Sequence, residues 1–481
     1  MGFADISDDL ARRVEGAGAS VSQALFEPVI RLGVTGLSRA GKTVFITSLV
    51  ANLMDRGRMP GLSAAASGAI TAAWLQPQPD LTLPRFDYES HLAALTGPEP
   101  RWPASTRSIS ELRLSLRVRP GGLWGAMTGG VTGPRTVHLD IVDYPGEWLL
   151  DLALLDKSYG DWAAETLERL ETRHADAPAA RSYLRAAAGT APEAAHDEAT
   201  AARLAEAFTG WLSQARAAGL ADCTPGRFLL PGDLAGSPAL TFAPLPAPAG
   251  PARRGSLWRE MERRFEGYKR EVVRPFFRDH FARIDRQVVL VDALGAIHAG
   301  PRAVEDLRRS MTELLAAFRP GRNPWLARLV RGRRVERILF AATKADHLHH
   351  RQHGRLTAIM EALLREARDR AQFAGAETAA MAIASLRTTV EETIAHKGEQ
   401  LDCVRGRLAE SGRQAAFYPG ALPDDPARLL GPARAGAPRW LDADYEVMRF
   451  APAPLRLRPG EGPPHIRLDR AAEFLIGDRL Q

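Results

Sequence analysis

The fold is decided by one stretch of the sequence, which reads Val29-Ile30-Arg31-Leu32-Gly33-Val34-Thr35-Gly36-Leu37-Ser38-Arg39-Ala40-Gly41-Lys42-Thr43. Its first seven residues are of strand type, and the other eight follow the pattern Gly-x-x-x-x-Gly-Lys-Thr. Apolar residues at helical spacing continue over residues 44–54. This order of strand, glycine-rich loop and helix predicts a loop that binds the phosphates of a nucleotide.

The residue types in this loop each have a physical reason. Gly36 and Gly41 let the backbone wrap so that its N–H groups point inward, where the helix N-terminus adds partial positive charge. Lys42 is expected to reach the β- and γ-phosphates, and the Thr43 hydroxyl to bind Mg²⁺. Further nucleotide contacts are expected from the other residues of this loop and from the start of the helix: Ser38, Arg39, Ala40 and Val44.

The composition is that of a globular protein large enough for two or three domains, or for one elaborated domain. The chain has 481 residues, of which 45% are hydrophobic and 25% charged, and its net charge of +6 is too modest to predict nucleic-acid binding. Only two cysteines occur, Cys223 and Cys403, which argues against a disulfide scaffold and a Cys-based zinc site and fits a reducing compartment.

Two features bear on contact with membranes. The first nine residues are acidic and lack the apolar core of a signal peptide, and no run of about 18 apolar residues follows anywhere in the sequence. Residues 322–334 are basic with Trp325 and Leu326 interleaved. We interpret this segment as a solvated connection between a helix and a strand, and contact with anionic lipid remains the alternative.

Strand and helix patterns alternate on either side of a helix-rich middle region. Strands are expected at residues 29–35, 112–118, 137–143, 287–294, 337–343 and 378–385. Helices are expected at residues 4–25, 44–54, 161–173, 201–217, 301–318, 354–372 and 469–480. A long helix from residue 257 should kink or end at Pro275. Residues 56–84 carry only a weak pattern, whereas 112–118 and 137–143 should form a hairpin.

This order predicts an α/β fold with a doubly wound, mostly parallel sheet, a large helical insertion and a C-terminal extension laid against the sheet. The expected segments are an N-terminal helix (1–28), the first part of the nucleotide-binding domain (29–150), the insertion (151–285), the second part of that domain (286–395) and the extension (396–481).

Two further motifs lie at expected strand ends, which is where ligands bind in such sheets. In Asp143-Tyr144-Pro145-Gly146, Asp143 can hold the Mg²⁺ shell and the Gly146 N–H can approach a γ-phosphate. In Thr343-Lys344-Ala345-Asp346, the carboxylate can accept hydrogen bonds from N1–H and the exocyclic amine of guanine, and the Lys344 stem can lie along the base. Adenine has no such donor pair, so ATP would leave a buried Asp346 unpaired.

The three motifs together resemble the GTPase branch of P-loop NTPases. The His-rich run Asp346-His347-Leu348-His349-His350 and the turn from Trp102 to Arg107 are similar to those of the YcjX-like family of bacterial stress-associated nucleotide-binding proteins. The resemblance covers most of the chain. It implies binding of GTP or GDP, and a cytoplasmic protein linked to envelope stress. A membrane-protein partner, contact with the inner-membrane periphery and a homodimer are the candidate associations.

The resemblance also assigns roles to single residues. Ser385 and Leu386 match the turn that contacts the base, and His347 is a further candidate contact. Thr106 is placed where a switch threonine meets Mg²⁺ and the γ-phosphate, and contacts to the nucleotide are expected from the rest of that turn: Trp102, Ser105 and Arg107. An ordinary surface loop is the alternative for this turn.

The catalytic candidates are Lys42 and Thr106, together with Glu147 and Arg39, which depart from the pattern of a minimal GTPase. Glu147 stands where a small GTPase has its water-orienting Gln, so it acts as a base or slows hydrolysis. Arg39 lies in a pattern that resembles guanylate-binding large GTPases, in which an arginine stabilises charge on the γ-phosphoryl group. A surface arginine that only contacts phosphate or solvent is the alternative.

Some alternatives remain open at this point. His349 and His353 have a spacing that can bind zinc, but we expect no carboxylate or Cys beside them, which favours a polar loop flanking the base pocket. The sequence predicts a slow Mg-dependent GTPase that acts as a stress-associated switch or assembly protein. The other classes are an ATP-dependent P-loop kinase or ATPase, and a nucleotide-stabilised scaffold with negligible turnover.

Overall fold

The structure is a computed structural model that describes residues 27–36, 40–104, 108–119, 133–218, 220, 223–316, 335–373, 376–440, 445 and 448–481. The expected N-terminal helix (4–25) and the basic segment (322–334) lie outside the described residues. So do five candidate site residues: Ser38, Arg39, Ser105, Thr106 and Arg107.

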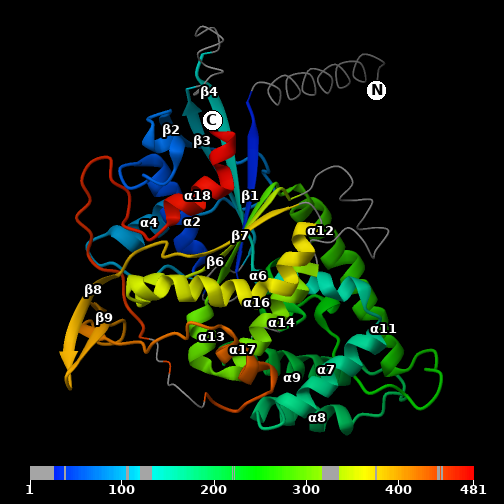
Figure 1. Cartoon of the computed structure of the whole chain (residues 1–481). Coiled ribbons are helices and arrows are strands. Elements are labelled where there is room, and N and C mark those ends of the chain that lie inside the picture. The colour runs from blue at the N-terminus through cyan, green and yellow to red at the C-terminus, as the bar shows by residue number, and fades with distance from the viewer. Residues whose placement is uncertain are drawn as a thin grey trace, which may run out of the picture.

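A seven-stranded mixed sheet forms the centre of the fold (Figure 1). Its strands are β1 (Val29–Gly36), β2 (Ile70–Gln76), β3 (Ser110–Val118), β4 (Arg135–Asp143), β5 (Arg286–Val291), β6 (Arg337–Ala342) and β7 (Glu377–Ala382), in the order β2-β3-β4-β1-β5-β6-β7. β1 pairs in parallel with both β4 and β5, and β5, β6 and β7 continue in parallel. The carboxyl ends of these five strands therefore meet at one edge, as the predicted α/β fold requires.

The predicted hairpin is confirmed, because β3 runs antiparallel to β4 with Ser110 opposite Asp143 and Val118 opposite Arg135. The prediction of a weak pattern at 56–84 missed β2, which pairs antiparallel with β3 at the edge of the sheet. Most β2 side chains are only half-buried. An edge strand of this kind has little hydrophobic alternation to reveal it in the sequence.

Both faces of the sheet are covered, and successive residues of a strand enter different cores. On β5, Val289 and Val291 belong to the core on one face, whereas Val288 and Leu290 belong to the core on the other. This is the pattern expected of a parallel strand buried on both sides. Helices α2 (Lys42–Met54) and α18 (Leu468–Ile476) pack into the second core, and helices α14 (Pro301–Ala316) and α16 (His353–Phe373) into the first.

The insertion is helical, as predicted, and packs as a layer of its own beside the sheet (Figure 1). Its helices are α7 (Tyr159–Arg173), α8 (Pro178–Ala188), α9 (Glu198–Ala217), α10 (Gly226–Leu229), α11 (Leu257–Tyr268) and α12 (Arg274–Asp279), and the short helix α6 (Gly146–Leu150) precedes it. The long helix is interrupted by a π-helical turn, Lys269–Val273, and Pro275 lies in the first turn of α12, where a proline is tolerated. Aromatic rings fill the insertion core, for example Trp162 stacked on Phe265 at 5.0 Å between ring centroids.

The C-terminal part divides between two places. Helix α18 lies against β5 and β6, as expected of an extension laid on the sheet. The strands β8 (Thr389–His396), β9 (Glu399–Arg407) and β10 (Gln414–Phe417) instead form a separate three-stranded sheet. Since the β8–β9 hairpin crosses position 395, the division into five segments stays a prediction.

The other α-helices within the described residues are α3 (Ser63–Ala66), α4 (Tyr88–Thr96), α13 (Ala293–Ala299) and α17 (Ala427–Arg434). Among the helices of the described part of the chain, none has both the length and the apolar composition needed to cross a bilayer.

Candidate nucleotide-binding site

A cavity of about 490 Å³ opens at the carboxyl edge of the central sheet. It gathers residues from the P-loop, the β6 and β7 ends, the insertion and the C-terminal part. The lining consists of Ala40, Gly41, Lys42, Thr43, Val44, Trp102, Pro103, Ala104, Arg216, Thr343, Lys344, Asp346, His347, Ala384, Ser385, Leu386, Ala409, Arg449 and Phe450. Its volume lies within the usual range for small-molecule sites.

One end of the cavity is formed by the loop between β1 and α2. Gly41 adopts a left-handed conformation (φ 86°) and immediately precedes the first residue of α2, so the helix N-terminus opens into the cavity. A Cβ at Gly36 would lie 2.7 Å from the Leu290 carbonyl oxygen, so only glycine fits where the loop leaves β1. Lys42 Nζ donates to the Gly36 carbonyl at 2.9 Å, which folds the ammonium over the loop.

The residues expected to hold Mg²⁺ suit that ion chemically. Thr43 is the second residue of α2 and lines the cavity. Asp143 ends β4, the neighbour of β1, and is paired in register with Val34. A hydroxyl and a carboxylate are hard oxygen ligands, which Mg²⁺ prefers. The donor set therefore fits Mg²⁺, although Thr106, the third predicted ligand, lies outside the described residues.

The Asp-x-x-Gly motif continues directly into helix α6, which the insertion covers. Gly146 is the first residue of α6, and Glu147 is only 3% exposed. Of the predicted site residues that the structure describes, four do not line the cavity: Gly36, Asp143, Gly146 and Glu147. Glu147 Oε1 lies 3.2 Å from Arg216 Nη2, so the carboxylate faces the insertion helix α9. Its predicted role as a base therefore stays a prediction.

The other end of the cavity is built around Asp346, which is 4% exposed. Asp346 Oδ2 accepts hydrogen bonds from the Thr388 backbone N–H at 2.9 Å and from its hydroxyl at 2.7 Å, so the carboxylate has a fixed orientation. Lys344 has a left-handed backbone (φ 61°), and its ammonium pairs with Asp292. Both residues line the same cavity as Lys42.

The remaining predicted base contacts also line this end. His347 is buried, which lowers its pKa and favours the neutral imidazole. Ser385 and Leu386 follow β7. The turn that contains them is held by the C-terminal segment, because the Ala384 N–H donates to the Ile466 carbonyl at 3.0 Å and the Ala384 carbonyl accepts from the Ile466 N–H at 2.8 Å.

Sequence reasoning missed the lining residues supplied by distant parts of the chain, namely Arg216, Ala409, Arg449 and Phe450. Phe450 packs edge-on against His347, with 5.2 Å between ring centroids. Its carbonyl oxygen accepts a hydrogen bond from Trp102 Nε1 at 2.8 Å, which joins the Trp102 turn to the C-terminal part of the chain. No pattern in the sequence signals these contacts, since Trp102 and Phe450 are 348 positions apart.

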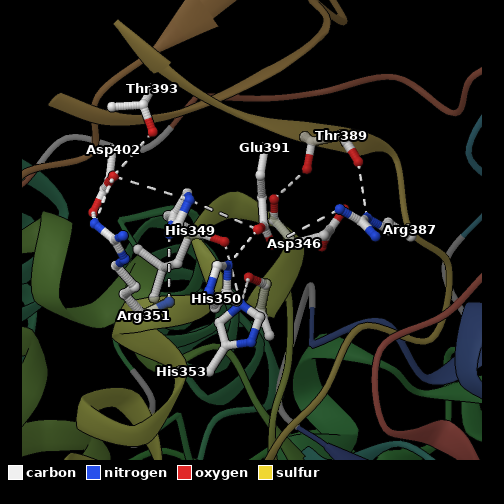
Figure 2. A network of polar contacts seen from close by, with 12 residues as sticks. Asp346, His349, His350, Arg351, His353, Arg387, Thr389, Glu391, Thr393 and Asp402 are labelled. Carbon is white, nitrogen blue, oxygen red and sulfur yellow. Dashed lines mark hydrogen bonds and ion pairs between the residues drawn. The ribbon is translucent and has the colours of Figure 1, made fainter. Parts of the chain in front are cut away.

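The expectation that no carboxylate would lie beside the histidines is wrong. Figure 2 shows Glu391 of β8 beside His349 and His350, with ligand-type atoms of all three within 4.8 Å of one another. Folding of the β8–β9 hairpin brings Glu391 to this loop from more than 40 positions away, and Asp402 comes with it. Spacing along the sequence could not show this.

The side chains of this cluster form polar contacts between the His349–Arg351 loop and the β8–β9 hairpin. His350 Nδ1 lies 2.6 Å from Glu391 Oε2, and Arg351 Nη1 lies 3.1 Å from Asp402 Oδ2. His349 Nδ1 accepts a hydrogen bond from the Arg351 backbone N–H at 3.4 Å. These contacts therefore hold the β8–β9 hairpin against the loop that follows Asp346.

Comparison with known proteins gives a consistent result. The profile of the YcjX-like family matches residues 30–480. The protein called Ras-like GTPase YcjX from Escherichia coli (strain K12) is 37% identical over 465 residues, which covers 94% of this chain and 96% of that protein. The protein of the same name from Shewanella oneidensis (strain MR-1) is 32% identical over 503 residues, which covers 100% of both chains. This chain belongs to the YcjX-like family.

Proposed function

We propose that this protein binds GTP and GDP together with Mg²⁺ and hydrolyses GTP slowly. The observation that carries the proposal is that Lys42 and Asp346 line one cavity, at its loop end and at its β6 end. Lys42 supplies charge for a triphosphate, and Asp346 supplies the acceptors that guanine requires. The name Ras-like GTPase, carried by two relatives, supports the same reading.

Each part of the cavity has a task in this proposal. The loop amides and Lys42 bind the phosphates, and Thr43 and Asp143 hold Mg²⁺, which would neutralise charge on the phosphates when bound. Asp346 recognises the base, with Lys344, Ser385 and Leu386 beside it. Phe450 and Trp102 cover the base end and keep water from it.

We further propose that the nucleotide state is passed to the insertion. Helix α6 begins at Gly146 and is in close contact with α10, where a Cβ at Gly226 would lie 2.3 Å from the Glu147 carbonyl oxygen. A shift of Gly146 towards a γ-phosphate would therefore displace insertion residues. This makes a switch or assembly protein a better description than a metabolic enzyme. Its association with stress, a membrane-protein partner, a homodimer and a place in the cytoplasm stay predictions of the family resemblance.

Phosphate release tests turnover. Lys42→Ala should reduce GTP hydrolysis on the order of 10²–10³-fold, because it removes one preorganised charge at the γ-phosphate. Lys157→Ala is the matched control, since Lys157 pairs with Glu165 on the insertion, outside the cavity lining. A wild-type protein that binds GTP but releases no phosphate above the Lys42→Ala level would be a nucleotide-stabilised scaffold.

A further inference from the structure

One arginine of the insertion reaches the nucleotide cavity. Arg216 lies in the last turn of α9, a helix that otherwise packs through apolar side chains such as Phe208 and Leu212. Its side chain is 24% exposed and lines the same cavity as Lys42 and Thr43. A guanidinium in that position can form two parallel hydrogen bonds with a phosphoryl group.

Arg216 forms an ion pair with Glu147 that is not a hydrogen bond. Its Nη2 atom lies 3.2 Å from Glu147 Oε1, yet neither carboxylate oxygen of Glu147 has a hydrogen-bond partner within the described residues. The Nε atom of Arg216 likewise has none in that part of the chain. A buried carboxylate without hydrogen bonds is costly, so this ion pair is a weak resting contact rather than a stable end state.

The contact with Glu147 brings Arg216 close to the Asp143-x-x-Gly146 motif. Glu147 directly follows Gly146, the residue whose N–H is expected to approach the γ-phosphate. With that role for Gly146, Arg216 lies at the phosphate end of the cavity. An arginine that served only to hold the insertion against α6 would not need to line the cavity.

We propose that Arg216 binds the γ-phosphoryl group of GTP, and that Glu147 holds this guanidinium at the edge of the cavity when no γ-phosphoryl group is present. This inference rests on the proposed function and assigns to it a residue of the insertion. The γ-phosphoryl oxygens carry more negative charge than one carboxylate, so the guanidinium exchanges its single contact with Glu147 for a charge-assisted pair of bonds. The insertion then senses GTP directly, through α9.

Binding and single-turnover measurements on Arg216→Ala test the proposal. GDP affinity should stay within about twofold of wild type, while affinity for a non-hydrolysable GTP analogue falls on the order of tenfold. GTP hydrolysis should fall on the order of 10³-fold, as for other arginines that act on the transferred phosphoryl group. Arg216→Lys should recover part of the analogue affinity and little of the rate. The matched control is Arg203→Ala, an exposed arginine of α9 that bonds to Thr200.

Equal losses of GDP and analogue affinity, or no loss of either, would overturn the role of Arg216. If Arg216→Ala unfolds because it leaves Glu147 unpaired, the double variant Arg216→Ala/Glu147→Gln removes the buried charge. That variant should recover the wild-type Tm and still bind the analogue on the order of tenfold more weakly than wild type, and wild-type affinity for the analogue would also contradict the proposal. Failure of the wild-type protein to bind either GTP or GDP would instead reject the proposed function itself.

Discussion

Trp102 and Phe450 connect the base end of the cavity to the C-terminal part of the chain. Trp102 is 40% exposed, but its indole N–H donates to the buried Phe450 carbonyl. The Phe450 ring packs so closely on β9 that a Cβ at Gly406 would lie 2.6 Å from it. Phe450 is thus fixed by the small sheet, and Trp102 is fixed by Phe450. We predict that these two residues slow the release of a bound base.

Trp102→Phe should accelerate GDP dissociation severalfold, because it keeps an aromatic ring and removes only the hydrogen bond to Phe450, worth about 0.5–1.5 kcal/mol. Stopped-flow displacement of a fluorescent GDP analogue measures this rate. Trp74→Phe on the edge strand β2 is the control, since Trp74 lies outside the cavity lining. An unchanged dissociation rate in Trp102→Phe would show that the turn does not retain the nucleotide.

Helix α6 is joined to the insertion by a buried polar contact as well as by packing. Asp151 follows α6 directly, and its carboxylate accepts from Tyr268 Oη at 2.5 Å and from the Gly226 N–H at 2.7 Å. Burial raises the pKa of Asp151 to about 7, although both hydrogen bonds act in the opposite direction. At alkaline pH the Asp151 carboxylate is therefore ionised, and its burial makes that charge unfavourable in the folded state.

Asp151→Asn should stabilise the protein at pH 8 by up to about 4 kcal/mol and have little effect at pH 4. The folded-state pKa lies above that of the unfolded chain, so the folded state holds its proton more tightly. Stability from this group therefore falls as pH rises from about 4 to 7. Urea denaturation of both proteins at pH 4 and pH 8 measures the difference. Glu111, whose pKa burial also raises to about 7, contributes equally to both proteins. An equal loss of stability between the two pH values in both proteins would contradict the assignment.

At the scale of the whole molecule, the sequence predicts what is local and misses what is distant. The P-loop, the Asp143 motif and the Asp346 motif each combine a strand with the turn that follows it, so their patterns lie within about 15 residues. Parallel pairing then brings the strand ends to one edge, which places Lys42 and Asp346 on one cavity. Arg216 and Phe450 reach the same cavity through packing of the insertion and the small sheet. No periodicity in a single sequence encodes such contacts.

The same limit explains the two errors in the sequence interpretation. Strand β2 is Ala-rich and half-buried, so its pattern is weak. Glu391 is brought to His349 and His350 by the β8–β9 hairpin, which reverses the chain far from the histidines. In both cases tertiary pairing, rather than local propensity, decides the outcome.

In the proposed function, one acid, Asp346, selects guanine in the cavity that Lys42 lines. Isothermal titration of GTP, GDP and ATP into wild type, Asp346→Asn and the exposed control Asp424→Asn tests it most directly. The bonds from Thr388 can pass to the amide oxygen, so the substitution mainly replaces an acceptor at the base with a donor. We predict that wild type and Asp424→Asn bind GTP at least about 100-fold more tightly than ATP, and that Asp346→Asn loses about 10–100-fold of its GTP affinity. Equal affinities for GTP and ATP in wild type, or an unchanged ratio in Asp346→Asn, would contradict the account.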